Sequence, residues 1–287
     1  MVSGLLAKFF PPPKFLAQPV IGLDVSDRSL KYIKLTPDRK NFTVDFFGEQ
    51  SIPVGFVDSG QIKNRAGLGQ TLKILRQGLK DPFAVVSLPE EHAFILRLSL
   101  PYMAPAEIRQ SLELQLEQYV PLKPGEAVFD YEVLKRAEEP GENYDLAVTV
   151  FPKPLILDYQ AVLTGAGFEP LAYEIEAQAI ARAVVHRHDP ITAMIIDFGK
   201  TRTSFFITKS QKVLFTSTLS GVGGESLTQS IKKNLKVDYE TAQKLKEKHG
   251  LLANQNKELI YALMPTVSVL RDEVNKIYNY WNTRQTN

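Results

Sequence analysis

The chain has 287 residues, a formal net charge of +2, and 44% hydrophobic and 23% charged residues. This near-neutral balance excludes the strong positive field that recruits nucleic acid, and the length suffices for two domains or one large bilobal domain. The absence of cysteine excludes a disulfide scaffold and thiolate metal sites. Because no run of about eighteen apolar residues occurs, no membrane-spanning helix is predicted.

Residues 1–19 are predicted to form a flexible tail, interrupted by a triple proline. They lack the long apolar h-region of a signal peptide. The alternative is a surface anchor, for which two lysines supply little attraction to anionic lipid. The apolar residues of such an anchor are Leu5, Leu6, Phe9 and Phe10.

Ordered structure is predicted to begin at Val20 with three antiparallel strands, followed by a helix and a buried strand. The helix prediction rests on four leucines at spacings of four, three and four residues, the stripe of an amphipathic helix. The predicted elements are Val20–Asp24, Leu30–Leu35, Asn41–Ile52, Leu68–Leu79 and Phe83–Leu88.

A compact inserted unit of roughly seventy residues, about half a typical domain, is predicted next. Its first helix begins at Pro105 and ends before Pro121, because proline is tolerated in the first turn of a helix but not in its interior. The apolar face of this helix, the expected core of the unit, comprises Ile108, Leu112, Leu116 and Tyr119. The other elements are expected at Ile95–Leu100, Val128–Leu134, Asp145–Phe151 and Leu155–Thr164.

The rest of the chain is predicted to hold an alanine-rich helix, a hairpin, a further strand and three helices. The hairpin is Met194–Ile207, and the other elements are Ile175–Val185, Lys212–Thr218, Ser226–Asn234, Tyr239–Lys248 and Thr266–Trp281.

The hairpin MIIDFGKTRTSFFI carries the residues that indicate function. Asp197 ends its first strand, and Gly199, Thr201 and Thr203 follow. Such a turn directs backbone N–H groups and hydroxyls to one place beside a carboxylate, which suits phosphate with a hydrated divalent cation. An ordinary turn with a hydrogen-bonding Asp has the same ingredients, so this motif alone leaves both interpretations open.

A second copy of the pattern lies at Asp24, where an apolar strand, an Asp, a polar turn and a second strand follow in the same order. Each copy is followed by a further strand, from Phe42 and from Lys212. A repeat of this kind indicates two similar lobes that clamp phosphates from both sides.

The chain resembles the actin-like ATPase superfamily and, within it, the PilM family of type IV pilus assembly proteins, relatives of the cell-division protein FtsA. The resemblance rests on five blocks in order: IGLDVSDRSLKYIKL, LPYMAPAEIRQSLELQLEQYVPL, EIEAQAIAR, IIDFGKTRTSFFI, and VGGESLTQSI followed by AQKLK. It implies an α/β, actin-like (ribonuclease H-like) duplicated fold, with two lobes around a nucleotide cleft and an inserted subdomain of the FtsA/PilM type.

The domains that the resemblance implies alternate along the chain. The first lobe takes residues 20–90 and 168–190, and the inserted subdomain takes 91–167. The second lobe has its core at 191–222 and 262–287 and a small subdomain at 223–261.

The resemblance also implies roles for particular residues. The first phosphate loop corresponds to Asp24, Ser26, Asp27 and Ser29, and the second to Asp197, Gly199, Thr201 and Thr203. Glu176 matches the catalytic acidic position, Gly223 and Gly224 match the glycine pair under the nucleoside, and Gln243 and Lys246 match the pair that contacts ribose and adenine. The implied cofactors are ATP or ADP with Mg²⁺, held through water by Asp24 and Asp197.

Three departures weaken the implied nucleotide site. Ser26 stands where the first loop usually has Gly, and Asp27 adds negative charge there, although Arg28 offsets it. Gln243 replaces the usual Glu. The given chain stops at Asn287, before a strand and a second glycine pair, so either it is truncated or the site lacks a wall. Nucleotide binding remains the expectation, with weak or absent binding as the alternative and at most a weak ATPase activity.

The function implied by the resemblance is that of a cytoplasmic component of the type IV pilus platform at the inner face of the cytoplasmic membrane. Its implied partner is the N-terminal cytoplasmic peptide of the membrane protein PilN, in a groove between the first lobe and the inserted subdomain, with candidates within Glu91–Asp130. Other platform proteins and self-association are further expected contacts, with no nucleic acid and membrane only through partners. The alternatives are an FtsA-like polymerising scaffold, an ATPase or kinase of the superfamily, and the cytoplasmic part of type II secretion protein L.

Overall fold

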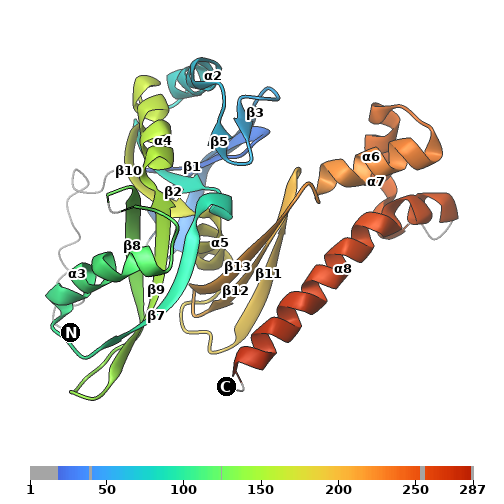
Figure 1. Ribbon diagram of the computed structural model, residues 1–287. Helices are drawn as coiled ribbons and strands as arrows, with labels where there is room; N and C mark the ends of the chain where they lie inside the picture. Colours follow the sequence, from blue (N-terminus) through green and yellow to red (C-terminus); the bar gives the residue numbers. More distant parts are fainter. Residues whose placement is uncertain (1–18, 39–40, 124, 253–255, 286–287) are drawn as a thin grey trace. The chain divides into compact units, whose positions relative to one another are not determined.

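The computed structural model describes residues 19–38, 41–123, 125–252 and 256–285 (Figure 1). The predicted tail therefore lies outside the described residues except for Pro19. The chain divides into two compact units, Met1–Ala193 with Ile207–Thr216, and Met194–Phe206 with Ser217–Asn287. The predicted domain boundaries remain predictions.

A five-stranded sheet forms the base of the first unit, in the order β10-β6-β1-β2-β3. β1 pairs antiparallel with β2 and parallel with β6, which pairs parallel with β10. One face of β1 is buried, through Ile21, Leu23 and Val25, because its apolar residues alternate along the strand. The strands are β1 (Ile21–Val25), β2 (Ser29–Asp38), β3 (Asn41–Ser51), β6 (Phe83–Leu88) and β10 (Glu169–Ile175).

Two helices of this unit, α2 (Arg65–Gln77) and α4 (Lys153–Gly165), pack side by side (Figure 1). The Asn64 side chain accepts a bond from the Gly67 N–H at 2.9 Å and so caps α2. A third helix, α5 (Glu176–Val184), contacts β10 and β6. A small hairpin of β4 (Val57–Asp58) and β5 (Gln61–Ile62) precedes α2, and the sequence pattern did not predict it.

A three-stranded antiparallel sheet, in the order β7-β9-β8, forms the centre of the predicted inserted unit. Its strands are β7 (Phe94–Pro101), β8 (Ala127–Lys135) and β9 (Asn143–Pro152), and its helix is α3 (Pro105–Gln115). Ile108, Leu112 and Leu116 are buried in its core, as expected. The prediction that Tyr119 belongs to this core is wrong: a 3₁₀ turn at Leu116–Gln118 ends the α-helical spacing and leaves Tyr119 49% exposed.

The second hairpin and its following strand form a three-stranded sheet of β11 (Thr192–Phe198), β12 (Arg202–Lys209) and β13 (Lys212–Ser220). Three helices follow: α6 (Gly224–Leu235), α7 (Tyr239–His249) and α8 (Lys257–Gln285). Their shared core comprises Ile231, Ala242, Leu259, Ala262 and Leu263. The predicted last helix was too short, because the prediction began it after Pro265, whereas α8 contains this proline.

Strand β10 was also not predicted, because its sequence contains Pro170 and two glutamates, which are rare in strands. Parallel pairing with β6 holds this segment as a strand although its composition does not indicate one. Within the described residues, no helix combines the length and hydrophobicity needed to cross a membrane.

Candidate functional site

The turn after Asp24 is closed by bonds within itself. The Ser26 N–H donates to the Ser29 carbonyl at 3.0 Å, and the Ser26 hydroxyl donates to the same oxygen at 3.0 Å. The Ser29 N–H in turn donates to the Ser26 hydroxyl oxygen at 3.3 Å. In this conformation the two serines predicted to hold phosphate therefore bond chiefly to each other.

Asp27 is turned toward the protein rather than toward a ligand. It is 8% exposed, and its Oδ1 accepts a bond from the Gly60 N–H at 3.0 Å. The Gly60 carbonyl accepts the hydroxyl of Tyr159, on α4, at 2.9 Å. The first turn is thus anchored to the β4–β5 hairpin and, through it, to α4. The predicted place of Asp27 in a nucleotide site remains a prediction.

The turn after Asp197 is closed by a different set of contacts. The Gly199 N–H donates to the Arg202 carbonyl at 2.9 Å, while the first N–H groups of α6 donate to the turn. Gly224 donates to the Gly199 carbonyl at 2.9 Å, and Glu225 donates to the Lys200 carbonyl at 2.8 Å. The helix N-terminus that could bind an anion therefore binds carbonyl oxygens of the neighbouring turn.

Two predicted ligand residues stabilise this arrangement. The Thr203 hydroxyl is buried and donates to the Val222 carbonyl at 2.7 Å. Gly223 permits the close approach, since a Cβ there would lie 2.6 Å from the Gly199 oxygen and 2.8 Å from the Lys200 oxygen. The sequence suggested that this glycine makes room for a ligand; in the structure it makes room for the turn.

Gln243 and Lys246, on α7, meet the first turn of α6. The Lys246 Nζ donates to the Gly224 carbonyl and to the Thr228 hydroxyl oxygen, both at 2.8 Å. The Thr228 hydroxyl donates to the Gln243 Oε1 at 2.7 Å. Burial lowers the pKa of the Lys246 ammonium, and the carboxylates of Glu225 and Glu247 act in the opposite direction.

The structure thus brings Gly199, Thr203, Gly223, Gly224, Gln243 and Lys246 together in the second unit. A nucleotide that used these groups would have to compete with their internal bonds. Glu176 is 8% exposed at the start of α5, in the first unit. Over the described ranges, no three His, Cys, Asp or Glu side chains cluster as metal ligands, and the assignment of Mg²⁺ to Asp24 and Asp197 through water remains a prediction.

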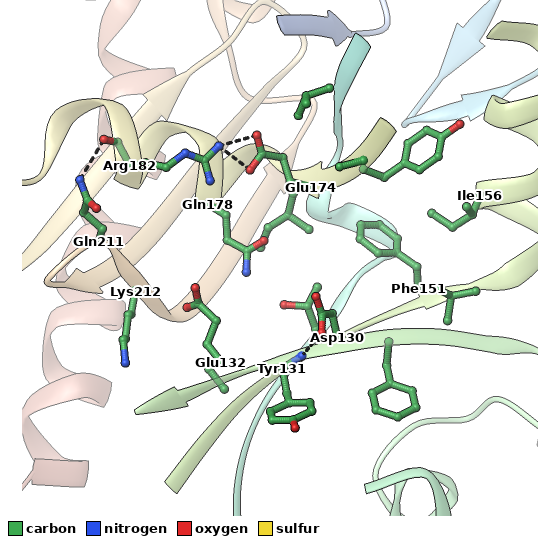
Figure 2. A pocket seen from close by; sticks show the side chains of 18 of the residues that line it. Asp130, Tyr131, Glu132, Phe151, Ile156, Glu174, Gln178, Arg182, Gln211 and Lys212 are labelled. Carbon is green, nitrogen blue, oxygen red and sulfur yellow. Dashed lines mark hydrogen bonds and ion pairs between the residues drawn. The ribbon is translucent and has the colours of Figure 1, made fainter. Parts of the chain in front are cut away.

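A hollow of about 1020 Å³ lies within the first unit, at the upper end of the size of ligand pockets. β8 and β9 line one side of it, and β10, α5 and the turn between β12 and β13 line another. Figure 2 shows Phe151 and Ile156 at one end and Arg182, Gln211 and Lys212 at the other. The hollow therefore offers an apolar end and a polar end to a ligand.

The polar end is held by specific bonds. The Arg182 guanidinium donates to both carboxylate oxygens of Glu174 at 2.6 Å. The Gln211 amide donates to the carbonyls of Arg182 and Val185, at 3.1 and 2.8 Å, and so caps the end of α5. Because Ser210 and Gln211 both have positive φ, at 51° and 68°, the tight turn directs Gln211 to this helix (Figure 2).

Tyr173 is the polar group in the lining that the protein itself leaves unsatisfied. Its hydroxyl is buried and has no hydrogen-bond partner among the described residues. Burial raises the pKa of this phenol to about 12, so the hydroxyl keeps its proton at physiological pH. A buried phenol of this kind can donate a hydrogen bond to a carbonyl oxygen of a bound ligand.

The sequence prediction covered only one side of this hollow. Arg109, Val128, Phe129 and Asp130 lie within the predicted range Glu91–Asp130 and do line it. Tyr173, Gln178 and the β12–β13 turn were missed, because β10 was not predicted and only the tertiary fold brings residues 210–212 to α5. The two positive-φ residues of that turn are Ser210 and Gln211, rather than the Gly or Asn that would have indicated a turn.

The paired strands and the repeat of an Asp-containing hairpin define a protein with the actin-like ATPase fold. Solved structures with this architecture are similar at low sequence identity. The ethanolamine utilization protein EutJ from Carboxydothermus hydrogenoformans has a TM-score of 0.54 and 14% identity, covering 94% of this chain and 73% of that one. MreB5 of Spiroplasma citri, solved bound to ADP, has a TM-score of 0.55 and 15% identity, covering 91% and 79%.

The family follows from the sequence match over residues 22–287 to the model of the type IV pilus assembly protein PilM: the chain belongs to this family. Consistent with this, the chain is similar to a structure of a PilM–PilN type IV pilus biogenesis complex, with a TM-score of 0.77 and 19% identity. That similarity covers 92% of this chain and 78% of the other. The predicted family and fold class are therefore confirmed.

Proposed function

We propose that this pilus assembly protein binds the N-terminal cytoplasmic peptide of PilN in the hollow of its first unit. The proposal is supported by one observation above all: a large hollow between the inserted sheet and β10 that contains a buried, unsatisfied phenol. The similar structure of a PilM–PilN complex supports the choice of partner. The protein would then act at the inner face of the cytoplasmic membrane, held there by its membrane partner and by other platform proteins.

The chemistry of the hollow restricts the peptide. An apolar side chain suits Phe151 and Ile156, and a backbone or side-chain oxygen suits the Tyr173 hydroxyl. The charged side chains in the lining are Arg109, Arg182, Arg187 and Lys212 against Asp130, Glu132 and Glu174. These charges nearly cancel, so affinity would depend on shape and hydrogen bonds more than on the net charge of the peptide.

Calorimetric titration of the protein with the matching PilN peptide tests this proposal. Tyr173→Phe keeps the ring and removes the hydroxyl, so we expect it to weaken binding about tenfold, the value of one or two buried hydrogen bonds. Tyr102→Phe is the matched control, because Tyr102 is 45% exposed and does not line the hollow. Absence of heat with the unmodified protein, with and without Mg-ATP, would refute peptide binding.

A nucleotide site is the second candidate, and the cluster around the N-terminus of α6 favours it. Six of the predicted nucleotide residues lie together there, and a structure of MreB5 with the same fold is bound to ADP. Because a ligand would compete with the internal bonds of this cluster, we expect weak binding of ATP or ADP. Asp197→Asn should abolish it if Asp197 holds Mg²⁺ through water. Unchanged binding in that variant, measured with a fluorescent ATP analogue, would exclude this role.

Nucleotide in this proposal biases the shape of the protein and is turned over at most slowly, with Glu176 as the predicted catalytic residue. A polymerising scaffold of the FtsA type is distinguished by pelleting: filaments that sediment with ATP and lipid would favour it over the peptide-binding component. Phosphate release well above background that Asp197→Asn removes would favour an ATPase or kinase.

A further inference from the structure

The outer edge of β8 borders the hollow. In the three-stranded sheet β8 pairs with β9 alone, so its other edge has no strand beside it among the described residues. In an antiparallel pair, alternate residues direct both their N–H and C=O groups to the same edge. The register with β9 is regular from Ala127 to Val133, before an irregularity between Val133 and Lys135.

Three charged side chains cover this edge at alternate residues. The Tyr131 N–H donates to the Oδ1 of Asp130 at 2.9 Å, and the Phe129 carbonyl accepts from the Nη2 of Arg109 at 3.3 Å (Figure 2 shows the first of these bonds). The Val133 carbonyl accepts from the Nζ of Lys212. The Tyr131 N–H bonds the Asp130 side chain and so is not bonded to β9. Tyr131 and the alternate residues Phe129 and Val133 therefore direct their backbone N–H and C=O groups away from β9, toward the hollow.

Charged side chains on an open edge are a common protection against unwanted strand pairing. Here they occupy the groups that an added strand would use: two carbonyls and the N–H between them. Two of the three contacts are weak or exposed, since the bond that the Tyr131 N–H donates to Asp130 is exposed and the Arg109 bond is long. An incoming backbone can therefore replace these two at small cost, whereas at the Val133 carbonyl it must displace the part-buried Lys212 ammonium.

We propose that the peptide binds as an added β-strand along the outer edge of β8, where its backbone replaces Arg109, Asp130 and Lys212 at Phe129, Tyr131 and Val133. This inference rests on the proposed function and adds the mode of binding. Main-chain bonds would supply affinity, while alternate side chains of the peptide would face opposite sides of the extended sheet and so select the sequence.

The edge of β10 also borders the hollow but suits an added strand less well. β10 contains Pro170, which has no N–H to donate, and its register is irregular between Pro170 and Ala172. β8 offers a longer regular edge. Backbone N–H and C=O groups at alternate residues of this edge already bond side chains, as the Phe129 carbonyl and the Tyr131 N–H do.

Hydrogen exchange of individual amides tests this mode. We expect saturating PilN peptide to slow exchange of the Tyr131 amide at least tenfold, because a strand bond replaces an exposed bond to Asp130. Amides of β7, the opposite edge strand of the same sheet, should keep their rates. If the peptide binds by calorimetry while Tyr131 is unchanged, or while β10 amides are slowed instead, strand addition to β8 is wrong and peptide binding survives. If no heat is measured, the proposed function itself fails.

A series of peptides, each with one N-methylated backbone position, gives an independent readout. A peptide that adds as a strand directs every second N–H to β8. We therefore expect losses of tenfold or more at alternate positions and losses below threefold at the positions between them, which serve as matched controls. Equal losses at successive positions, or no loss anywhere along the bound segment, would overturn the proposal.

Discussion

The turns after Asp24 and Asp197 arise from similar sequence patterns, yet the structure closes them in different ways. In the first, two serines bond each other and Asp27 reaches Gly60 in a separate hairpin. In the second, the helix that follows supplies its N-terminal N–H groups to the carbonyls of Gly199 and Lys200. An Asp-containing hairpin therefore predicts the backbone path, while the contacts that satisfy its polar groups depend on neighbouring elements.

This difference has a functional consequence. Both turns satisfy many of their polar groups internally, so a ligand there would compete with those bonds, whereas the lining of the hollow includes Tyr173, whose buried hydroxyl has no partner among the described residues.

Gly60→Ala should have the largest effect, since it damages the anchor of the first turn. Gly60 has φ of +74°, and a Cβ there would lie 2.3 Å from Cγ of Pro89. Backbone strain and the steric overlap together should cost about 3 kcal/mol of unfolding free energy, measured by circular dichroism in urea. The matched control is Gly55→Ala, with φ of +87° and nothing within 4 Å, which should cost only about 1 kcal/mol of strain. Equal losses in both variants would show that the hairpin does not pack as described.

Gly223→Ala should destabilise the second turn by about 2 kcal/mol, through overlap with the carbonyls of Gly199 and Lys200. The backbone of Gly223 is extended, so the cost is steric alone. The single tryptophan, Trp281, lies in α8 of the second unit, and its fluorescence reports unfolding there. Gly224→Ala is the control, because its nearest neighbour is the flexible end of Lys246 at 3.5 Å. A neutral Gly223→Ala would contradict the close approach of α6 to the turn.

Tyr159→Phe removes the hydroxyl that holds the Gly60 carbonyl from α4. The lost hydrogen bond should lower the free energy of unfolding by about 1 kcal/mol, with the fold retained. Tyr102→Phe, at an exposed site, should change the urea midpoint little. If the two variants are equally stable, the anchor of the first turn does not extend to α4.

The smallest effect concerns pH. Since burial lowers the pKa of Lys246 in the folded protein, the unfolded chain binds more protons between that lowered value and the unfolded value of 10.5. The free energy of unfolding of the second unit should therefore rise with pH across this window. When the urea midpoint, followed by Trp281 fluorescence, is plotted against pH, Lys246→Met should reduce the slope. An identical slope in the variant would show that Lys246 is not desolvated beside α6.

The sequence predicted the backbone of both turns because alternating apolar residues and strand-breaking residues are local features. It also predicted α3 from its flanking prolines and apolar face, most of α2 from leucine spacing, and the family from the order of five blocks. It could not predict that Asp27 turns to Gly60, since 33 residues of chain separate them. The side of the hollow formed by β10 and the β12–β13 turn was missed for the same reason: long-range pairing, rather than composition, determines it.

The central claim, that the peptide occupies the hollow of the first unit, is tested most directly by filling that space. Gln178, on α5, points into the hollow (Figure 2), and Gln178→Trp would occupy it. Val184→Trp, on the same helix, is the control, because Val184 is 66% exposed and does not line the hollow. Calorimetry with the PilN peptide should show at least a thirtyfold loss of affinity for Gln178→Trp and less than a twofold change for Val184→Trp, where about 1.4 kcal/mol corresponds to tenfold. Full affinity in a folded Gln178→Trp variant would contradict the claim.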